Sequence, residues 1–399
     1  MVAATPDLLL RQGLACHQRG DLQGAAALYR QVLALCPRDG NALNLLGQLA
    51  RAGGDRDAAL RLTGQALATQ PDAPVFLAAH GAALAEAGQL PRAEQVLRAA
   101  VAARPADVVS LRNLGQVLSA RNRPGEALAP LRQAAAQAPG DAAVRLALAH
   151  ALRESGHAAE AVAEARLAAA DPGLAEQAGF LLAALGAADA PGRAPAGYVR
   201  DLFDQYATRF DDALQGLGYR TPALLAEMLA QAGAPGGQAV LDLGCGTGLS
   251  GVALAPFAAR LVGVDLSPRM LDAARARGLY HALHEADLLD FLPGHPGGFG
   301  IVAAADVLNY LGDLSAVLPL LAAALAPSGL LAFSLERGED APGAPAAVLG
   351  PGLRFRHNPA ALRPLAAASG LHLLEERAVV LRQERGAAVD GLLWLFRRQ

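Results

Sequence analysis

Three glycines and two aspartates are spaced to hold a charged nucleoside. "LDLGCGTG" (241–248) follows an apolar run, and Gly244, Gly246 and Gly248 alternate within it. Glycines at this spacing permit a tight turn and bring backbone N–H groups close to a ligand. Asp242 precedes the turn, and Asp265 ends the next apolar run, "VGVDLS". A carboxylate at the second position can accept hydrogen bonds from both ribose hydroxyls of a nucleoside.

The spacing and the charge favour S-adenosylmethionine (SAM) over a dinucleotide. A dinucleotide loop reads G-x-G-x-x-G/A, because the pyrophosphate sits on a helix N-terminus. Here Leu249 stands at the sixth position. Asp242 would repel a pyrophosphate, whereas it suits the ammonium and sulfonium groups of SAM.

Residues farther along the chain are candidates for the acceptor side. Tyr310, Glu336 and His357 could take part in catalysis, and Asn309, Tyr310, Arg354 and Arg356 could bind an acceptor. Each could equally be an ordinary loop residue. A carboxylate acceptor would need no base, but an alcohol or a nitrogen usually would. His281 and His284 fall on opposite faces of a strand, so no metal site is expected.

The elements that must position these residues alternate between strand and helix. Helical patterns separate strand patterns, which predicts a parallel, doubly wound α/β sheet. "LHLLEERAVVLRQERG" and "VDGLLWLF" then predict an antiparallel hairpin at one edge. The five strand patterns before the hairpin cover 239–243, 260–264, 281–285, 301–305 and 330–335.

At this point the sequence resembles the class I SAM-dependent methyltransferases. The first two motifs are the glycine loop with Asp242 and the Asp265 strand end, and "EADLLDF" looks like the third. Gly300 and Ser328 depart from the family pattern. The resemblance implies a seven-stranded, Rossmann-like domain that binds SAM, releases S-adenosylhomocysteine (SAH) and needs no metal. The cofactor residues that it implies are Asp242, Gly244, Cys245, Gly246, Thr247, Gly248, Asp265, Leu266, Met270, Ala286, Asp287, Leu288, Ala305, Asp306 and Val307.

A Gly/Ala/Pro-rich stretch and an aromatic helix precede the sheet. "GAADAPGRAPAG" (186–197) cannot sustain a helix and is typical of a linker. "YVRDLFDQYATRFD" follows and is similar to a helix of bacterial methyltransferases that carry tetratricopeptide repeats. That resemblance implies that Phe203 and Tyr206 cover the cofactor. A stripe that only packs on the next domain is the alternative.

The first half of the chain repeats with a period of 34 residues. Prolines recur at 37, 71, 105 and 139, and glycines at 13, 47, 81 and 115. This period resembles the tetratricopeptide repeat, an all-α solenoid of antiparallel helix pairs. We expect about five repeats and a capping helix over 1–185, a linker over 186–197 and the methyltransferase domain over 198–399. Groove-facing positions that could bind a protein or peptide partner are Asn44, Gln48, Arg51, Arg112 and Gln116.

Composition narrows the function classes. The formal net charge is −3 and no basic domain is visible, so nucleic acid is not an expected partner. Three scattered cysteines suit a reducing compartment, and no apolar stretch predicts a membrane span or signal peptide, so we expect a cytoplasmic protein. Two functions stay open: a methyltransferase whose repeats recruit a partner, and a non-catalytic SAM-binding scaffold.

Overall fold

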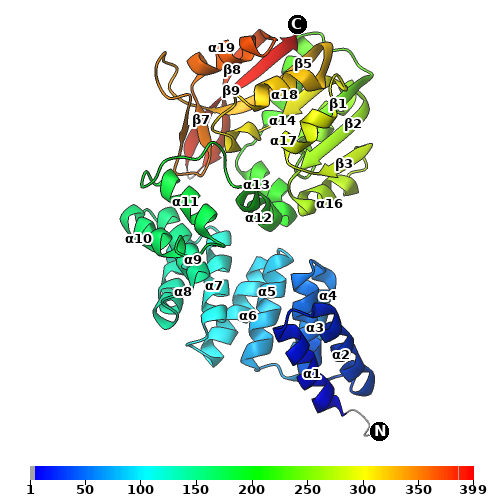
Figure 1. The fold of residues 1–399 in the computed structure, drawn as a ribbon, viewed down its shortest axis with the longest axis vertical. Coiled ribbons are helices and arrows are strands. Elements are labelled where there is room, and N and C mark those ends of the chain that lie inside the picture. The colour runs from blue at the N-terminus through cyan, green and yellow to red at the C-terminus, as the bar shows by residue number, and fades with distance from the viewer. Residues whose placement is uncertain (1–4, 385) are drawn as a thin grey trace. The chain divides into compact units, whose positions relative to one another are not determined.

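A computed structural model describes residues 5–384 and 386–399, which form two compact units (Figure 1). The first unit is Met1–Ala178 and the second is Gly179–Gln399. Residues 1–4, in the predicted repeat region, and Arg385, in the predicted hairpin, lie outside the described residues. Within the described residues, no helix is both long and apolar enough to cross a membrane.

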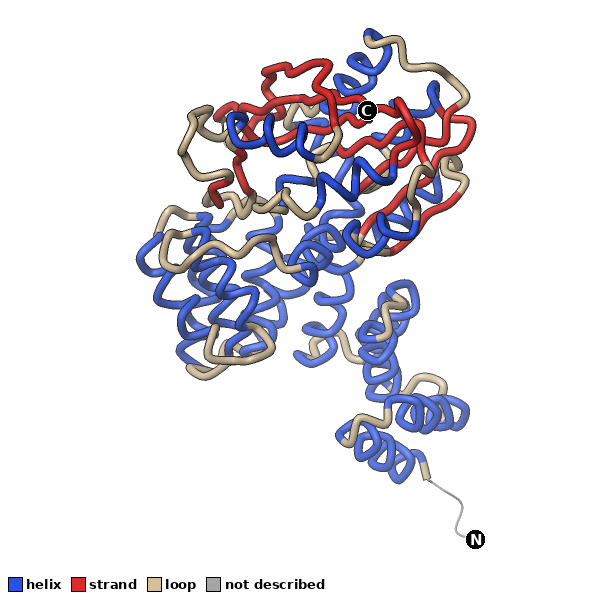
Figure 2. The backbone as a smooth tube through the Cα atoms, turned by 45° about the horizontal axis from the view of Figure 1, so that its top comes forward, coloured by secondary structure: helices blue, strands red, loops and turns tan. Residues whose placement is uncertain are grey.

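The first unit consists of helices in antiparallel pairs, drawn in blue in Figure 2. Aspartate side chains cap the N-termini of several helices; Asp39, for example, accepts a hydrogen bond from the Ala42 N–H at 2.8 Å. The second helix of each of the first four pairs ends one or two residues before the recurring proline. The paired helices are α1 (Pro6–Gln18), α2 (Leu22–Leu35), α3 (Gly40–Ala52), α4 (Arg56–Thr69), α5 (Pro74–Glu86), α6 (Leu90–Ala103), α7 (Val108–Ala120), α8 (Pro124–Gln137), α9 (Ala142–Glu154) and α10 (Ala158–Ala168). Helix α11 (Ala175–Ala184) begins in the first unit and ends in the second.

The recurring glycines lie where paired helices touch. A Cβ atom on Gly13 would stand 2.5 Å from Cε1 of Tyr29, and one on Gly81 would stand 2.6 Å from Cγ of Leu97. Tyr29 and Leu97 are fully buried. Only glycine therefore allows these helices to approach so closely. The close helix pairs, repeated along the unit, confirm the predicted tetratricopeptide fold.

The second unit is built on one nine-stranded sheet. The strands are β1 (Gln238–Leu243), β2 (Ala258–Asp265), β3 (Ala282–Glu285), β4 (Phe299–Ala304), β5 (Leu325–Arg337), β6 (Ala347–Leu349), β7 (Phe355–His357), β8 (Leu371–Glu384) and β9 (Ala387–Arg398). Their order is β3-β2-β1-β4-β5-β7-β6, and β9 pairs antiparallel with both β5 and β8. The seven predicted strands are present with β8 and β9 as the hairpin. The short strands β6 and β7 were not predicted from the sequence; they lie in the Gly/Pro-rich region after β5.

Helices cover both faces of this sheet (Figures 1 and 2). Alternate residues of β1 illustrate the division, because Leu241 packs with one core cluster and Val240 with the other. The chain runs outward from β1 to β3 and then returns to β4 beside β1. The strand order therefore reverses between β1 and β4, where ligands of such sheets bind. The helices are α12 (Ala196–Tyr206), α13 (Phe210–Gly216), α14 (Thr221–Gln231), α15 (Leu249–Leu254), α16 (Pro268–Ala276), α17 (Leu288–Phe291), α18 (Val317–Ala324) and α19 (Pro359–Ala368).

The segment predicted as a linker is attached to the second unit. The Ala194 N–H donates to the Tyr310 carbonyl at 2.8 Å, and the Gly192 carbonyl accepts from the N–H groups of Gly312 and Asp313. Phe180, near the end of the predicted capping helix, stacks at a tilt on Tyr198 with ring centroids 5.4 Å apart. These contacts explain why the second unit begins at Gly179, earlier than the predicted boundary, and why 186–197 is not a free tether.

Candidate active site

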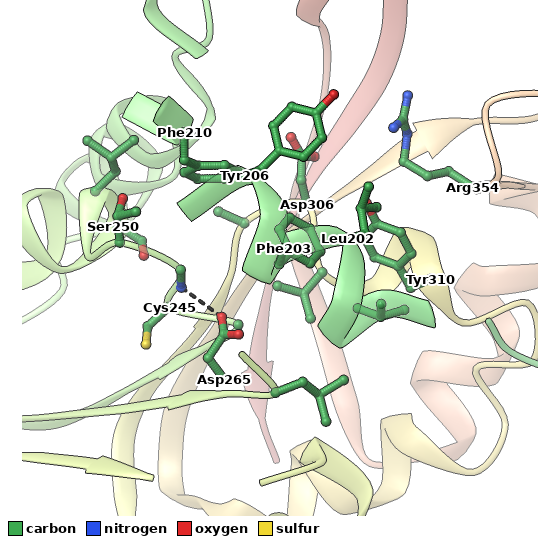
Figure 3. Close-up of a pocket in the computed structure, with 18 of the residues that line it drawn as sticks. Leu202, Phe203, Tyr206, Phe210, Cys245, Ser250, Asp265, Asp306, Tyr310 and Arg354 are labelled. Atoms are coloured by element: carbon green, nitrogen blue, oxygen red, sulfur yellow. Dashed lines mark hydrogen bonds between the residues drawn. The ribbon is translucent and has the colours of Figure 1, made fainter. Parts of the chain in front are cut away.

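A cavity of about 330 Å³ lies at the carboxyl ends of β1, β2 and β4. Figure 3 shows side chains from these strand ends and from α12 and α13 pointing into it. Most of the predicted cofactor residues line this cavity, namely Tyr206, Gly244, Cys245, Gly246, Thr247, Asp265, Leu266, Ala286, Asp287, Leu288, Ala305, Asp306 and Val307. The structure thus brings together five segments that are separated in sequence.

The glycine loop turns sharply between β1 and α15. Gly244, Gly246 and Gly248 have φ angles of 59°, 53° and 90°, in the left-handed region that side chains disfavour. A Cβ on Gly244 would clash with the Val307 side chain of the neighbouring loop. The loop therefore presents its backbone to the cavity. A side chain at these positions would occupy part of that space.

Asp265 lies at the end of β2 with its carboxylate tied to backbone donors. Its Oδ2 accepts from the Gly246 N–H and its Oδ1 from the Ser267 N–H, both at 2.8 Å. Burial raises the pKa of Asp265 to about 6, although these hydrogen bonds oppose the shift. Each oxygen keeps a further lone pair for a ligand hydroxyl.

Asp287 caps the short helix α17 and also lines the cavity. Its Oδ1 accepts from the Leu289 N–H at 2.9 Å, and its Oδ2 accepts from Arg193 Nη1 at 2.9 Å. Arg193 belongs to the segment predicted as a linker, and no sequence pattern places it at the cavity. The pair joins that segment to the β3 side of the cavity.

Asp242 does not line the cavity, contrary to the role predicted for it. Its Oδ2 accepts from the Ser250 hydroxyl at 2.7 Å and from the Tyr280 hydroxyl at 2.6 Å. Oδ1 is buried without a hydrogen-bond partner, and burial raises the pKa of Asp242 to about 7. The side chain therefore supports the glycine loop from beneath.

Two other predicted cofactor residues point elsewhere. Met270 is fully buried on α16, within the packing between that helix and the sheet. Gly248 does not line the cavity, and a Cβ there would meet Arg277 and Tyr280. Met270 and Gly248 were predicted from their positions in a motif. Such a motif predicts the path of the backbone but not whether each residue faces the cavity.

Helices α12 and α13 form a lid, defined here as residues 196–216. Phe203 stacks edge-on against Phe210 and Tyr310, with centroids 6.0 and 5.6 Å away, and these rings line the cavity. The aromatic cluster, which includes Phe210, was predicted from the sequence. Other lid and neighbouring residues of the lining were not, namely Val199, Leu202, Ala213, Leu214, Leu217, Tyr219 and Pro222.

Polar contacts hold the lid against the sheet. The Ser267 hydroxyl donates to Asp204 at 2.6 Å, and the Thr247 hydroxyl donates to Asp211 at 2.5 Å. Arg277 also pairs with Asp211. The lid is thus joined both to the glycine loop and to the residues after Asp265.

The far end of the cavity carries charged residues that belong to distant segments. Tyr310 and Arg354 line it as predicted, whereas Arg382 and Glu384, both on β8, were missed. Figure 3 shows Tyr310 and Arg354 on the side away from Cys245 and Asp265. The charged residues that follow the apolar run "AVVL" in β8 were the sequence signal that could have indicated this role.

Four predicted acceptor-side residues do not line the cavity. His357 is buried, its Nε2 bonds the Leu311 carbonyl at 2.7 Å, and burial lowers its pKa to about 4. Arg356 is exposed on β7. Asn309 accepts from the Glu336 N–H at 2.8 Å, and the Glu336 carboxylate accepts from Arg354. Asn309 and Glu336 thus lie behind the cavity wall and hold residues that line it, such as Arg354.

The predicted partner positions of the first unit differ in their availability. Asn44 is only 2% exposed, so it belongs to the core of the repeats and not to a groove surface. Arg51 pairs with Glu86 at 2.7 Å. Gln48, Arg112 and Gln116 keep partly or fully exposed side chains.

Family models match a part of each unit. A family model described as "Methyltransferase domain" matches residues 240–329, and one described as "Tetratricopeptide repeat" matches residues 8–43. The chain is thus similar to a methyltransferase domain in its second unit and to a tetratricopeptide repeat in its first. In the described residues of that domain and of the repeats, no cluster of three or more His, Cys, Asp or Glu is placed to hold a metal ion.

Curated relatives match the methyltransferase domain over part of their length. Human "Methyltransferase-like protein 27" is 40% identical over 111 residues, which are 27% of this chain and 45% of that protein. "Ubiquinone biosynthesis O-methyltransferase" of Sodalis glossinidius is 29% identical over 140 residues, 33% of this chain and 56% of that protein. The chain thus spans about half the length of these relatives.

Solved structures show a limited similarity to part of this chain. The chain of Pseudomonas aeruginosa PilF has 23% identity and a TM-score of 0.41, covering 45% of this chain and 81% of its own. The N-methyltransferase NodS from Bradyrhizobium japonicum, solved with SAH, has 25% identity and a TM-score of 0.35, covering 44% of this chain and 85% of its own.

Proposed function

We propose that the chain transfers a methyl group from SAM to an acceptor bound at the far end of the same cavity. The observation that carries the proposal is the convergence of the glycine loop, Asp265 and Asp287 on one cavity beneath an aromatic lid. SAM supplies an activated methyl group on a sulfonium sulfur. The protein contributes orientation, exclusion of water and placement of the acceptor.

The residues around the cavity fit the parts of SAM. The Asp265 carboxylate has lone pairs for the two ribose hydroxyls, and Asp287 with Ala286 and Leu288 would border the adenine. The loop from Ala305 to Val307 would border the methionine end. The lid aromatic rings would cover the ligand and keep water from the sulfonium.

Calorimetric titration of the full chain tests whether SAM binds. We expect binding of SAM and of SAH, and no binding of NAD⁺ under the same conditions. An absence of heat with both SAM and SAH would remove the basis of the proposal. Tight binding of NAD⁺ would overturn the choice of ligand.

Catalysis and a non-catalytic SAM scaffold are separated by a second experiment. The full chain is incubated with methyl-labelled SAM and a cell extract, and the extract is divided into small molecules and proteins. Label in either fraction supports a methyltransferase and tells which kind of acceptor it uses. Binding of SAM without transfer of label would support the scaffold.

We propose that the repeats bind a protein or peptide through α7, where Arg112 is partly exposed and Gln116 is exposed. An acidic peptide with a free C-terminal carboxylate is the probe, and its amidated form is the control. Arg112→Glu should weaken binding of the free acid in particular. Equal binding of both peptides would contradict carboxylate recognition.

The cytoplasmic location stays a prediction.

A further inference from the structure

Asp306, directly after β4, is held in a strained conformation beside the cavity. Its φ is 58°, in the left-handed region, which costs free energy for a residue other than glycine. Its own N–H donates to the Ser334 hydroxyl at 2.7 Å, and that hydroxyl donates to Asp306 Oδ1 at 2.7 Å. Asn309 Nδ2 reaches the same oxygen at 3.3 Å. The side chain is thus fixed through Oδ1.

Two side chains approach the rest of the Asp306 carboxylate: the Tyr219 hydroxyl hydrogen-bonds it, and Arg382 lies near Oδ2. Arg382 Nη1 lies 3.7 Å from Oδ2, which is too far for a hydrogen bond. Asp306 lines the cavity, and only 16% of its side chain is exposed. A lone pair on Oδ2 can therefore accept a proton from a molecule in the cavity.

The charges that surround Asp306 disfavour an anionic acceptor. Arg382 pairs with Glu336 and, at 2.9 Å, with Glu384. Arg354 pairs with Glu336 at 2.6 Å and with Glu384 at 2.5 Å. Two guanidinium groups therefore face three carboxylates once Asp306 is counted, an excess of one negative charge. Both arginines are already engaged, so a carboxylate ligand would find neither a free cation nor a favourable field.

On the basis of the methyl transfer proposed above, we propose that the acceptor is an alcohol, phenol or amine, not a carboxylate, and that Asp306 receives its proton. The new bond joins the acceptor oxygen or nitrogen to the methyl carbon as the methyl–sulfur bond breaks. The sulfur keeps that electron pair. The proton of the attacking atom passes to Asp306 Oδ2, and the neutral acid then loses it to solvent. Asp306 is in this sense a catalytic residue.

Burial supports the same assignment by making Asp306 a better proton acceptor. Desolvation raises its pKa above the ordinary value, although Arg382, Arg354 and the Ser334 hydroxyl oppose the shift and Glu336 adds to it. Glu384 also lies nearby, and its two arginine partners lower its pKa. Two tyrosines complete the surroundings: burial, the charge of Asp306 and a hydrogen bond to it raise the pKa of Tyr219, and burial raises that of Tyr310. Both stay neutral at physiological pH and do not compete for the proton.

Asp306→Asn is the decisive variant because it preserves the fold locally. Asparagine tolerates the left-handed conformation and keeps an oxygen for the Ser334 hydroxyl. Asp272→Asn is the matched control, since Asp272 is an exposed carboxylate on α16. Each full-length protein is tested for SAM binding, melting temperature, and transfer of labelled methyl to catechol, benzylamine, benzoate and a cell extract.

We expect Asp306→Asn to bind SAM, to transfer methyl groups about 10²- to 10⁴-fold more slowly at pH 7, and to lose the acid limb of the pH profile. Products should resist mild base, which hydrolyses methyl esters but not ethers or methylamines. Failure of the wild type to bind SAM would refute the proposed function itself. With SAM bound, base-labile products, methylation of benzoate alone or an unchanged rate in the variant would overturn the inference.

Melting temperature provides a readout that does not depend on activity. The raised pKa means that the charged form of Asp306 costs stability in the folded state. That cost is absent below the pKa of the unfolded chain and is fully present above the folded pKa. Asp306→Asn should therefore melt at a higher temperature than the wild type at pH 7.5, and Asp272→Asn should not. A lower melting temperature would assign Asp306 a structural role and overturn the inference.

Discussion

Asp265→Asn tests how the cavity holds the nucleoside. The wild-type carboxylate accepts from the Gly246 and Ser267 N–H groups and keeps lone pairs for ligand hydroxyls. Asparagine has nearly the same shape, but one of its two positions becomes an NH₂ group. That group would face a backbone donor on one side and could not accept from a ribose hydroxyl. The substitution thus removes the negative charge and one acceptor at once.

The expected loss follows from the number of interactions removed. A hydrogen bond to a charged group contributes about 1.5–3 kcal/mol. Losing one such bond to a ribose hydroxyl should weaken binding of both SAM and SAH by about 10- to 150-fold. SAM and SAH share the ribose, so both should lose the same factor. Asp272→Asn, on the exposed face of α16, should change neither affinity.

Calorimetry as a function of pH adds a second, independent check. The pKa of Asp265 is about 6, and ligand hydroxyls prefer the deprotonated form. Wild-type affinity should therefore be full above pH 6 and fall by up to about tenfold per pH unit below it. In Asp265→Asn this dependence should vanish. An unchanged affinity in the variant, or a wild-type affinity that rises as the pH falls, would refute the reasoning.

Three further variants probe the lid, the repeats and the acceptor side. Asp211→Ala removes an acceptor for Thr247 and should raise the SAM dissociation rate about two- to tenfold in stopped-flow measurements. Gly81→Ala places a Cβ 2.6 Å from Leu97 Cγ and should destabilise the repeats by about 1–3 kcal/mol in thermal melts, whereas Gly125→Ala on α8, which meets nothing within 4 Å, should not. His357→Ala should lower the melting temperature but leave the pH profile of activity between pH 5 and 8 unchanged, because its pKa is already about 4. A lost acid limb in that variant would restore His357 as a base.

The sequence predicted the donor side of the cavity well because its residues follow consecutive strands. Parallel strands bring their carboxyl ends to one edge, so a motif after each strand is enough to place Asp265, Asp287 and Asp306 together. The same logic could not place Asp242 or Met270. A motif gives the path of the backbone, whereas the direction of a side chain depends on neighbours such as Tyr280, which claims the Asp242 carboxylate.

The acceptor side could not be predicted to the same extent. Arg382 and Glu384 lie on β8, which reaches the cavity only because β9 pairs between β5 and β8. Arg193 comes from a segment whose composition is typical of a linker. No local pattern connects these residues to Asp306, since their meeting depends on strand order and on backbone hydrogen bonds between distant loops. His357 was a candidate base because histidine often transfers protons in enzymes. Its ring is buried and bonded to the Leu311 carbonyl, which indicates a structural role.

The charges around the cavity connect the donor and acceptor arguments. The lining residues include Arg193, Arg354 and Arg382 against Asp265, Asp287, Asp306 and Glu384, an excess of one negative charge. Asp242 and Glu336, buried just behind the wall, add to that excess. Such a field favours a ligand with a positive charge and opposes one with a negative charge. Burial is the main cause that raises the pKa of Asp265 to about 6 and that of Asp242 to about 7, and a neighbouring carboxylate adds to each shift. A bound sulfonium would stabilise these carboxylates in their charged form, whereas the product thioether would not. Under the proposed function, the same electrostatics would favour a cationic methyl donor, weaken the binding of its product and disfavour a carboxylate as the acceptor.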